Sequence, residues 1–251
     1  MDAAPITWTD TYKVRVNETD RKARATPMAM LDFFQTSAWN HYSAVEKARG
    51  TLLEPDQIWV MSRMYVEFSA FPLWQEEIDM HTWARPMEKF LAYREFRAEK
   101  NGKLFCQGSV IWMVLDTKTN RPVRLAKIGS QWAGLIDERA ASRDPEKIKE
   151  NTDKKPDVYT PVKYFDIDVN GHVNNVKYLQ RAMETYAPEF LDGRPLKTLD
   201  INFLNESSLG DSLGVVSAPL GNDNYLHSIF RKKDGTEVCR MKAIWEGVSE
   251  N

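Results

Sequence analysis

The sequence predicts an α+β protein built from two related units, and three observations indicate this fold class. Stretches of the chain recur in the same order, each copy contains a segment with the spacing of an apolar helix face, and each then continues into strand-like segments. The chain has 251 residues, 42% of them hydrophobic, which is enough for one or two packed cores. We therefore expect two units of roughly 100 residues, each with one long helix and a mostly antiparallel sheet.

The duplication is visible at three places. Residues 101–106 resemble residues 234–239, both ending in Cys, and an Ile-Trp pair follows each at the same distance. Residues 66–68 lie opposite residues 201–203 at nearly the same separation. The helix-like segment after Thr26 lies opposite the one after His172. Three matches in one order indicate a repeat whose loops differ slightly in length.

Each copy is expected to start with an extended segment, at residues 11–16 and 158–164, followed by its helix. Thr26 is a good N-cap, Pro27 fits the first helical position, and Gly50 can end the first helix. The second helix should begin at Asn174 or Asn175. The apolar faces are Leu31, Phe34, Ala38, Tyr42 and Val45 in the first helix, and Val176, Leu179, Met183 and Tyr186 in the second.

The strands after each helix are expected to form hairpins. Asn-Gly at 101–102 and Asp-Gly at 234–235 favour type I′ turns, in which both central residues have positive φ. Residues 109–115 form a nearly continuous apolar strand, expected to be buried on both faces. Residues 137–157 are mostly charged and contain Pro145 and Pro156, which predicts a solvated linker with some helix. We expect an N-terminal unit at 1–130, a linker at 131–157 and a C-terminal unit at 158–251.

Composition excludes several classes of protein. The 34 basic and 36 acidic side chains give a net charge of -2, which argues against a non-specific nucleic-acid binder. With two Cys there is no disulfide scaffold. The start of the chain has no signal-peptide pattern, and no apolar run approaches the ~20 residues that span a bilayer. We expect a soluble, cytoplasmic protein without a membrane span.

His172 stands out among four histidines because it follows Asp168 and Asn170 directly before the second helix. His41, His81 and His227 lie in ordinary helix or strand settings. Backbone N–H groups at a helix start can receive an oxyanion, so this segment could form a catalytic site or serve only as a turn and cap.

A metal site is not expected at this segment. It begins like a calcium-binding EF-hand loop, but Lys177 stands where that loop requires a bidentate Glu. No second His or Cys lies at ligand spacing from His172.

The repeat strengthens the catalytic interpretation. Residues 20–26, placed opposite 166–172, contain neither the Asn nor the His. Glu206 lies just after the strand at 199–204, and its counterpart is the apolar Phe71. Glu206 could be an ordinary exposed carboxylate at a strand end or a carboxylate directed at the same site as His172.

Residues 166–178, Asp-Ile-Asp-Val-Asn-Gly-His-Val-Asn-Asn-Val-Lys-Tyr, closely resemble the signature of the acyl-ACP thioesterases of plants and bacteria. The resemblance covers nearly the whole chain. It implies a tandem, or double, hotdog fold and, because no plastid transit peptide precedes the motif, a bacterial member or a mature form. It further implies hydrolysis of fatty acyl-ACP thioesters to free fatty acid and ACP, ending fatty acid synthesis, without a cofactor.

The resemblance implies a catalytic set of Asp168, Asn170, His172 and Glu206. Plant members have a Cys after that Glu, and here the residue is Ser207. Cys106 and Cys239 occupy matching repeat positions, as buried structural thiols would, so carboxylate chemistry is favoured over a Cys nucleophile. His172 and Glu206 would activate water by general base action. Asn170 would orient either the thioester carbonyl or Asp168. Helix N–H groups would bind the thioester oxygen. Asp168 would either position its neighbours or attack to form an acyl anhydride.

The resemblance also places the acyl chain in the N-terminal unit and makes acyl carrier protein the partner. The expected lining residues are Met28, Met30, Phe33, Phe34, Trp39 and Met61. Two basic clusters could contact the acidic carrier, Arg21, Lys22 and Arg24 in one and Arg121 and Arg124 in the other. Homodimer formation, carrier identity (ACP or CoA) and chain length are left open. The alternatives are an acyl-CoA thioesterase, a hotdog enoyl-thioester hydratase and a non-catalytic acyl-ACP binding module.

Overall fold

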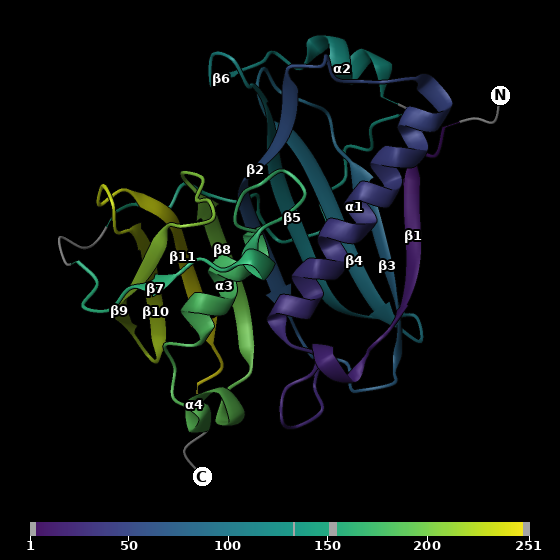
Figure 1. The fold of residues 1–251 in the computed structure, drawn as a ribbon. Helices are drawn as coiled ribbons and strands as arrows, with labels where there is room; N and C mark the ends of the chain where they lie inside the picture. Colours follow the sequence, from purple (N-terminus) through teal and green to yellow (C-terminus); the bar gives the residue numbers. More distant parts are fainter. Residues whose placement is uncertain (1–3, 133, 151–154, 248–251) are drawn as a thin grey trace. The chain divides into compact units, whose positions relative to one another are not determined.

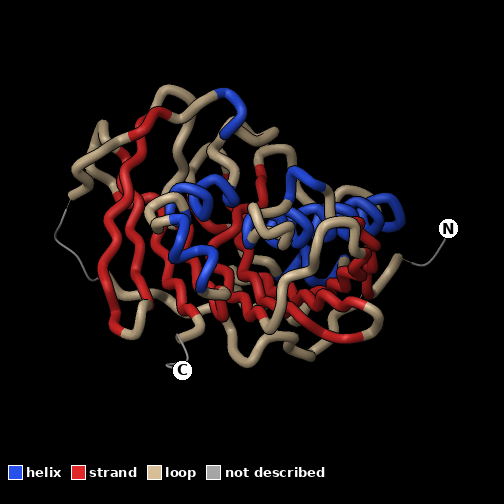
Figure 2. Tube along the Cα trace, turned by 90° about the horizontal axis from the view of Figure 1, so that it is seen from below, coloured by secondary structure: helices blue, strands red, loops and turns tan. Residues whose placement is uncertain are grey.

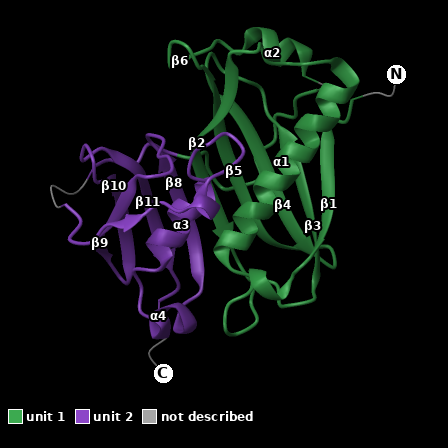
Figure 3. Cartoon of the chain, viewed as in Figure 1, with its two compact units in different colours: residues 1–145 green, residues 146–251 purple. Residues whose placement is uncertain are grey.

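The computed structural model describes residues 4–132, 134–150 and 155–247, and the chain divides into two compact units (Figure 3). Unit 1 comprises residues 1–145 and unit 2 residues 146–251. The division falls at Pro145, inside the charged stretch that the sequence marks out.

Unit 1 consists of a long helix that lies against one face of an antiparallel sheet (Figures 1 and 2). Across the sheet the strands are β1 (Thr7–Lys13), β3 (Glu77–Ala84), β4 (Ala92–Lys100), β5 (Lys103–Asp116) and β2 (Gln57–Phe68). The unit is completed by the 3-10 turn η1 (Val16–Glu18), the short strand β6 (Arg121–Pro122) on β5, and the short helix α2 (Ala126–Gln131).

The long helix α1 (Pro27–Arg49) has the termini that the sequence predicts. The Thr26 hydroxyl accepts a hydrogen bond from the Ala29 N–H at 3.2 Å, and Pro27 occupies the first turn, where its missing N–H has no cost. Gly50 ends the helix with φ of 87°, a conformation that favours glycine. Of the predicted apolar face, Leu31, Phe34, Ala38 and Val45 are buried and Tyr42 is partly buried.

Unit 2 repeats this topology. Its sheet order is β7 (Thr160–Pro161), β9 (Ser212–Gly221), β10 (Asn224–Arg231), β11 (Glu237–Trp245) and β8 (Leu196–Phe203). Its helices are the 3-10 turn η2 (Tyr164–Asp166), α3 (Asn175–Met183) and α4 (Pro188–Gly193). Val176, Leu179 and Met183 of α3 are buried, whereas Tyr186 lies beyond the end of this helix.

Strand register confirms the duplication. Cys106 of β5 pairs with Phe68 of β2, and Cys239 of β11 pairs with Phe203 of β8, so the same two positions meet in both sheets. Both cysteines are buried, and burial raises the pKa of each thiol well above its ordinary value. They are structural thiols, as expected.

Three local expectations need correction. The first extended segment, expected at 11–16, is β1, which begins at Thr7. The second, expected at 158–164, is only the short β7. A 3-10 turn follows each of them. Asn101 and Gly102 have φ of 53° and 70° and form the predicted turn. At 234–235 only Gly235 has positive φ, because the Asp234 carboxylate accepts hydrogen bonds from the Arg231 side chain and the Thr236 N–H and so closes a longer loop.

Residues 137–150 of the charged stretch are bonded to their own units, unlike a solvated linker, and residues 151–154 of the expected linker lie outside the described residues. Residues 137–150 contain no helix, and the polar groups there bind within their own units. In unit 1, the Ala140 N–H donates to the buried Glu95 carboxylate at 2.9 Å. In unit 2, the Ile148 N–H donates to Asn202 Oδ1 at 2.8 Å. Within the described ranges, no helix is both long and apolar enough to cross a membrane.

Candidate active site

The motif segment forms a tight loop between η2 and α3. Ile167 pairs with Val173, and the Asp168 N–H donates to the His172 carbonyl at 2.8 Å. Gly171 adopts φ of 82°, which explains the glycine at this turn. Asp168 Oδ1 accepts from the N–H groups of Asn170 at 2.8 Å and His172 at 3.3 Å. The Asp168 carboxylate thus holds the backbone that carries both predicted catalytic partners.

The backbone N–H groups at the start of α3 form hydrogen bonds within unit 2, which differs from our expectation. Asn174 is the N-cap, and its side-chain oxygen accepts from the Val176 N–H at 2.9 Å. The Lys177 N–H donates to the Asn174 carbonyl, and the Val173 N–H donates to the Ser207 carbonyl. These three N–H groups are already bonded within the unit and are not available to a thioester oxygen, and the role of the helix start in binding that oxygen stays a prediction.

His172 and Glu206 meet, although they are far apart in the sequence. His172 Nε2 lies 3.1 Å from Glu206 Oε2, and their side chains are 32% and 51% exposed. A bridge between His172 and Ser208 brings the end of β8 beside the motif loop. A partly exposed imidazole held by a carboxylate can take a proton from water and return it to a leaving group. Asn170 lies exposed on the same loop, two residues from His172.

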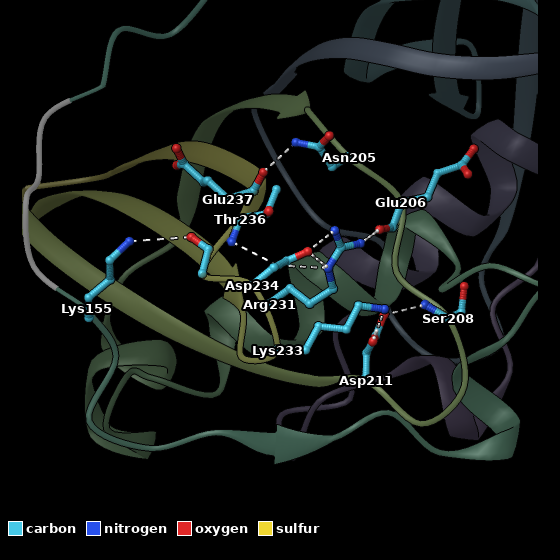
Figure 4. Close-up of polar contacts among 11 residues, drawn as sticks. Lys155, Asn205, Glu206, Ser208, Asp211, Arg231, Lys233, Asp234, Thr236 and Glu237 are labelled. Atoms are coloured by element: carbon cyan, nitrogen blue, oxygen red, sulfur yellow. Dashed lines mark hydrogen bonds and ion pairs between the residues drawn. The ribbon is translucent and has the colours of Figure 1, made fainter. Parts of the chain in front are cut away.

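The backbone beside Glu206 is held by an arginine that our sequence analysis missed (Figure 4). Arg231 Nη1 donates to the Glu206 carbonyl oxygen at 2.5 Å, while its Nη2 lies 2.7 Å from Asp234 Oδ2. The Glu206 carboxylate points away from Arg231, which contacts only the backbone of that residue (Figure 4). The only signal in the sequence is an Arg three residues before an Asp at a turn, which is too common to indicate a role.

The next turn of the same loop is held by Asp211. Its Oδ2 accepts from the Ser208 N–H at 3.0 Å, and its Oδ1 lies 2.7 Å from Lys233 Nζ (Figure 4). The Asp211 side chain is 5% exposed, and these contacts lower the pKa of its carboxyl although burial opposes them. The loop that carries Glu206 is therefore fixed at both ends.

Among the described residues, neither cysteine nor Ser207 is accessible at this pair, whereas Ser208, which bridges to His172, is exposed. Ser207, which follows Glu206, is fully buried and lies beneath the loop. Cys106 and Cys239 are buried in strands. The carboxylate and imidazole are thus the exposed reactive groups of the motif. Among the described residues there is no group of three or more His, Cys, Asp or Glu side chains arranged to hold a metal ion.

The repeat register at the motif differs by two residues from the one we expected. The Thr26 N–H donates to the Glu18 carbonyl, just as the Asn174 N–H donates to the Asp166 carbonyl. Residues 20–26 therefore correspond to 168–174, and Asp20 is the counterpart of Asp168. Lys22 and Arg24 stand in the places of Asn170 and His172.

A pocket in unit 1 lies among α1, β2 to β5 and Trp132. Of the residues expected to bind the acyl chain, Trp39 lines it and is 46% exposed. Met30, Phe33, Phe34 and Met61 are buried in unit 1 without lining this pocket, and Met28 is partly buried.

The basic clusters are also placed. Arg21 and Lys22 are exposed in the loop before α1, and Arg24 forms an ion pair with Asp20 at 2.7 Å. Arg121 is exposed, and Arg124 lies over the Phe90 ring at 5.5 Å. These placements leave both clusters on the surface of unit 1.

Two curated proteins are similar to this chain over most of its length. A palmitoyl-acyl carrier protein thioesterase of Arabidopsis thaliana is 25% identical over 93% of the chain, and a dodecanoyl-[acyl-carrier-protein] hydrolase of Cinnamomum camphora is 24% identical over 94%. The chain covers 62% and 66% of these relatives' lengths.

Two solved structures share the fold over nearly their whole length. An acyl-ACP thioesterase from Bacteroides thetaiotaomicron has a TM-score of 0.87 and 23% identity, with 98% of this chain and 100% of that one covered. A 12:0-ACP thioesterase from Umbellularia californica has a TM-score of 0.85 and 21% identity, with 98% and 99% covered. The fold is the double hotdog, as expected.

The family models cover both units. The acyl-ACP thioesterase N-terminal domain matches residues 5–128, and the acyl-ACP thioesterase C-terminal domain matches residues 148–247. Together they span most of the chain, including the motif loop and Glu206. The chain belongs to the acyl-ACP thioesterase family.

Proposed function

We propose that the protein hydrolyses fatty acyl-ACP thioesters to free fatty acid and ACP, and so ends fatty acid synthesis. The observation that carries the proposal is the contact of 3.1 Å between His172 Nε2 and Glu206 Oε2 on an exposed loop. Family membership and the names of the relatives support the substrate class. The chain spans about 62% of the length of the first of these relatives, so the activity in their names is proposed for this chain rather than shown.

In the proposed reaction the Glu206 carboxylate accepts a hydrogen bond from the Nε2–H of His172, which leaves Nδ1 free to take a proton from water. The water oxygen attacks the thioester carbonyl carbon, and the C–S bond breaks with its electron pair going to sulfur. The proton held by His172 then goes to the departing thiolate. Asn170, exposed on the same loop, orients the carbonyl group. Water, acyl group and thiol balance without a cofactor.

Asp168 is proposed to position the loop rather than to attack the thioester. Its Oδ1 already accepts two backbone N–H groups, and Asp20 binds its own loop in the same way in unit 1, where the His and Glu are replaced. A single turnover in heavy-oxygen water tests this role, because an acyl anhydride would leave label in Asp168. Label found only in the fatty acid is the expected result.

A thiol-release assay with acyl-ACPs of graded chain length tests the function. His172→Gln and Glu206→Gln should each lose roughly 100-fold or more of turnover, the usual contribution of acid–base catalysis. Glu189→Gln, at an exposed position in α4, is the matched control. Turnover by both site variants equal to that of the unchanged protein would show that the site is elsewhere.

The same assay separates the alternatives. Equal rates on acyl-CoA would favour an acyl-CoA thioesterase, and a hydratase would leave saturated acyl-ACP intact. A binding module would bind acyl-ACP without releasing thiol. The proposal also includes a cytoplasmic location and a homodimer. It further includes docking of the carrier at one of two basic clusters, Arg21, Lys22 and Arg24 or Arg121 and Arg124. Fractionation, light scattering and charge-reversal variants test them in turn.

A further inference from the structure

The pocket of unit 1 is not a plain apolar cavity. Its lining includes the rings of Trp39, Tyr42, Trp59 and Trp112, but it also includes the guanidinium-bearing Arg94 of β4. Arg94 is 6% exposed, so a positive charge is buried at the wall of an aromatic pocket. Buried charges are ordinarily paired, and an unpaired one is costly.

Arg94 has only neutral partners. Its Nη1 donates to His41 Nδ1 at 3.0 Å and to Thr82 Oγ1 at 3.3 Å, and its guanidinium lies 5.5 Å from the Trp132 ring. Among the residues that the structure describes, the N–H groups on Nε and Nη2 have no hydrogen-bond partner and Arg94 forms no ion pair. Three of its five donors are therefore unused.

Neither neighbouring titratable group compensates the charge. His41 accepts from Arg94 at Nδ1 and so donates from Nε2 to the Pro5 carbonyl; burial and the Arg94 charge lower its pKa to about 4, which keeps it neutral. Glu95 follows Arg94 on the strand and points to the other face, where its carboxylate binds Arg85, Ser109 and the Ala140 N–H.

Three further donors beside this pocket lack partners. The indole Nε1 atoms of Trp59, Trp112 and Trp132 are buried and, within the described part of the chain, make no hydrogen bond. The Tyr42 hydroxyl is already used, because it donates to Glu46 Oε1 at 2.6 Å. The Arg94 guanidinium at the pocket wall therefore has donors without an acceptor, and a purely hydrocarbon occupant would leave them unsatisfied.

We propose that this pocket binds an acyl chain that carries an oxygen substituent remote from the thioester, and that Arg94 selects it. A hydroxyl, oxo or carboxylate oxygen would accept from the unused guanidinium N–H groups, while the aromatic rings contact the methylene groups. This inference rests on the proposed function, because it takes the occupant to be an acyl group. It makes Arg94 a specificity residue rather than a catalytic one.

Binding can be measured without catalysis, because the tryptophans of the pocket report an occupant by fluorescence. The probes are pantetheine thioethers of equal chain length that end in methyl, hydroxymethyl or carboxylate. The oxygenated probes should bind roughly 10- to 100-fold more tightly than the methyl probe, as expected for a hydrogen bond to a charged group. Equal or weaker binding of both oxygenated probes would overturn the inference.

Variants test the role of the guanidinium. Arg94→Met should remove the preference and improve binding of the methyl probe, and a buried charge replaced by an apolar side chain of similar size usually folds. Arg94→Lys should keep part of the preference because it keeps the charge. Arg97→Met, on the same strand but paired with Glu138 at 2.7 Å, is the control and should change nothing. A preference that persists in Arg94→Met would contradict the inference.

Hydrolysis of the matching acyl-ACPs separates the two proposals. Oxygenated substrates should have the higher kcat/KM, and Arg94→Met should reverse this order. Hydrolysis of plain and oxygenated chains at equal kcat/KM, unaffected by Arg94→Met, would refute the inference while the proposed function stands. Arg94-dependent binding without hydrolysis of any acyl-ACP would refute the function while the pocket assignment stands.

Discussion

The two units build the same loop before their helices but equip it differently. In unit 1, Asp20 Oδ1 accepts from the N–H groups of Lys22 at 2.8 Å and Arg24 at 3.0 Å. In unit 2, Asp168 does the same for the two residues in the corresponding places. The carboxylate therefore belongs to the scaffold of the repeat. What distinguishes unit 2 is the pair of His172, on this loop, and Glu206, on the segment between β8 and β9.

The interiors also differ at corresponding residues. In unit 2 the Trp245 Nε1 donates to the Tyr186 hydroxyl at 3.1 Å, and that hydroxyl and Ser217 bind the two ring nitrogens of His227 at 2.8 Å each. Its repeat counterpart in unit 1, Trp112, has an indole N–H without a partner at the edge of a pocket. The indole N–H of Trp245 is thus paired within unit 2, whereas that of Trp112 has no hydrogen-bond partner among the described residues.

The sharpest test replaces Glu206, which distinguishes the segment after β8 in unit 2 from the segment after β2 in unit 1. Glu206→Phe gives unit 2 the side chain that unit 1 has at Phe71, and we expect a roughly 1,000-fold loss of kcat because His172 loses its carboxylate partner. Phe71→Leu should leave kcat unchanged. Thiol release measures both. A Glu206→Phe protein with ordinary kcat would mean that the difference between the loops is unrelated to catalysis.

Acid should destabilise both units through their buried histidines. Burial lowers the pKa of His41 and of His227 from the ordinary 6.5 to about 4. Between these values the unfolded chain binds a proton that the folded one does not. Stability is therefore full above about 6.5 and falls as the pH decreases to about 4, by about 3 kcal/mol per histidine.

Urea unfolding at a series of pH values measures this loss. His227→Gln should flatten the decline by removing one of the two histidines, whereas His81→Gln, in a strand at an only partly buried position, should not. A decline of the same steepness in His227→Gln would show that this histidine is not kept neutral by its surroundings.

Loss of the Arg231 contact should weaken the site moderately. Arg231→Met removes the bond to the Glu206 carbonyl, and we expect a roughly 10-fold lower kcat with KM unchanged, because the carboxylate is displaced rather than lost. Arg231→Lys should recover part of the rate. Urea unfolding first measures the fraction of each variant that is folded, and kcat is then calculated per folded molecule. An unchanged kcat in folded Arg231→Met would mean that Arg231 serves stability alone.

The smallest effect concerns the paired tryptophans. Trp245→Phe breaks a buried hydrogen bond and leaves the Tyr186 hydroxyl short of a donor, whereas Trp112→Phe breaks none. We expect Trp245→Phe to cost about 1 kcal/mol more in free energy of unfolding than Trp112→Phe. Equal losses in urea unfolding would mean that the two interiors are more alike than their hydrogen bonds indicate.

Much of the fold could be predicted because its signals are local. Thr26, Pro27 and Gly50 define α1 through capping chemistry that acts within a turn, and the recurrence of Cys106 and Cys239 predicted which positions of the two units correspond. The Asp234-Gly235 turn was wrong because the Arg231 side chain, rather than the dipeptide, decides how that loop closes. The extended segment expected at 158–164 is only Thr160–Pro161, because so short a strand at a sheet edge leaves no clear periodicity in the sequence.

The candidate site was predictable in composition and not in geometry. His172 and Glu206 could be named from the sequence, but only the structure showed that their side chains meet. It likewise assigned the Asp168 carboxylate to backbone N–H groups and showed Arg231 behind Glu206. Such contacts join residues distant in the chain, and no local pattern records them.

The sequence by itself determined the duplication, the helix ends, the family and the residues of the motif, because periodicity, capping and motif spacing are properties of neighbouring residues. The tertiary structure alone decided which carboxylate touches the imidazole, which donors remain unused around the unit 1 pocket, and that Arg94 is buried there without an anion. The reason is physical: burial and pairing depend on what surrounds a side chain in space, and that environment is assembled from strands and helices far apart in the chain.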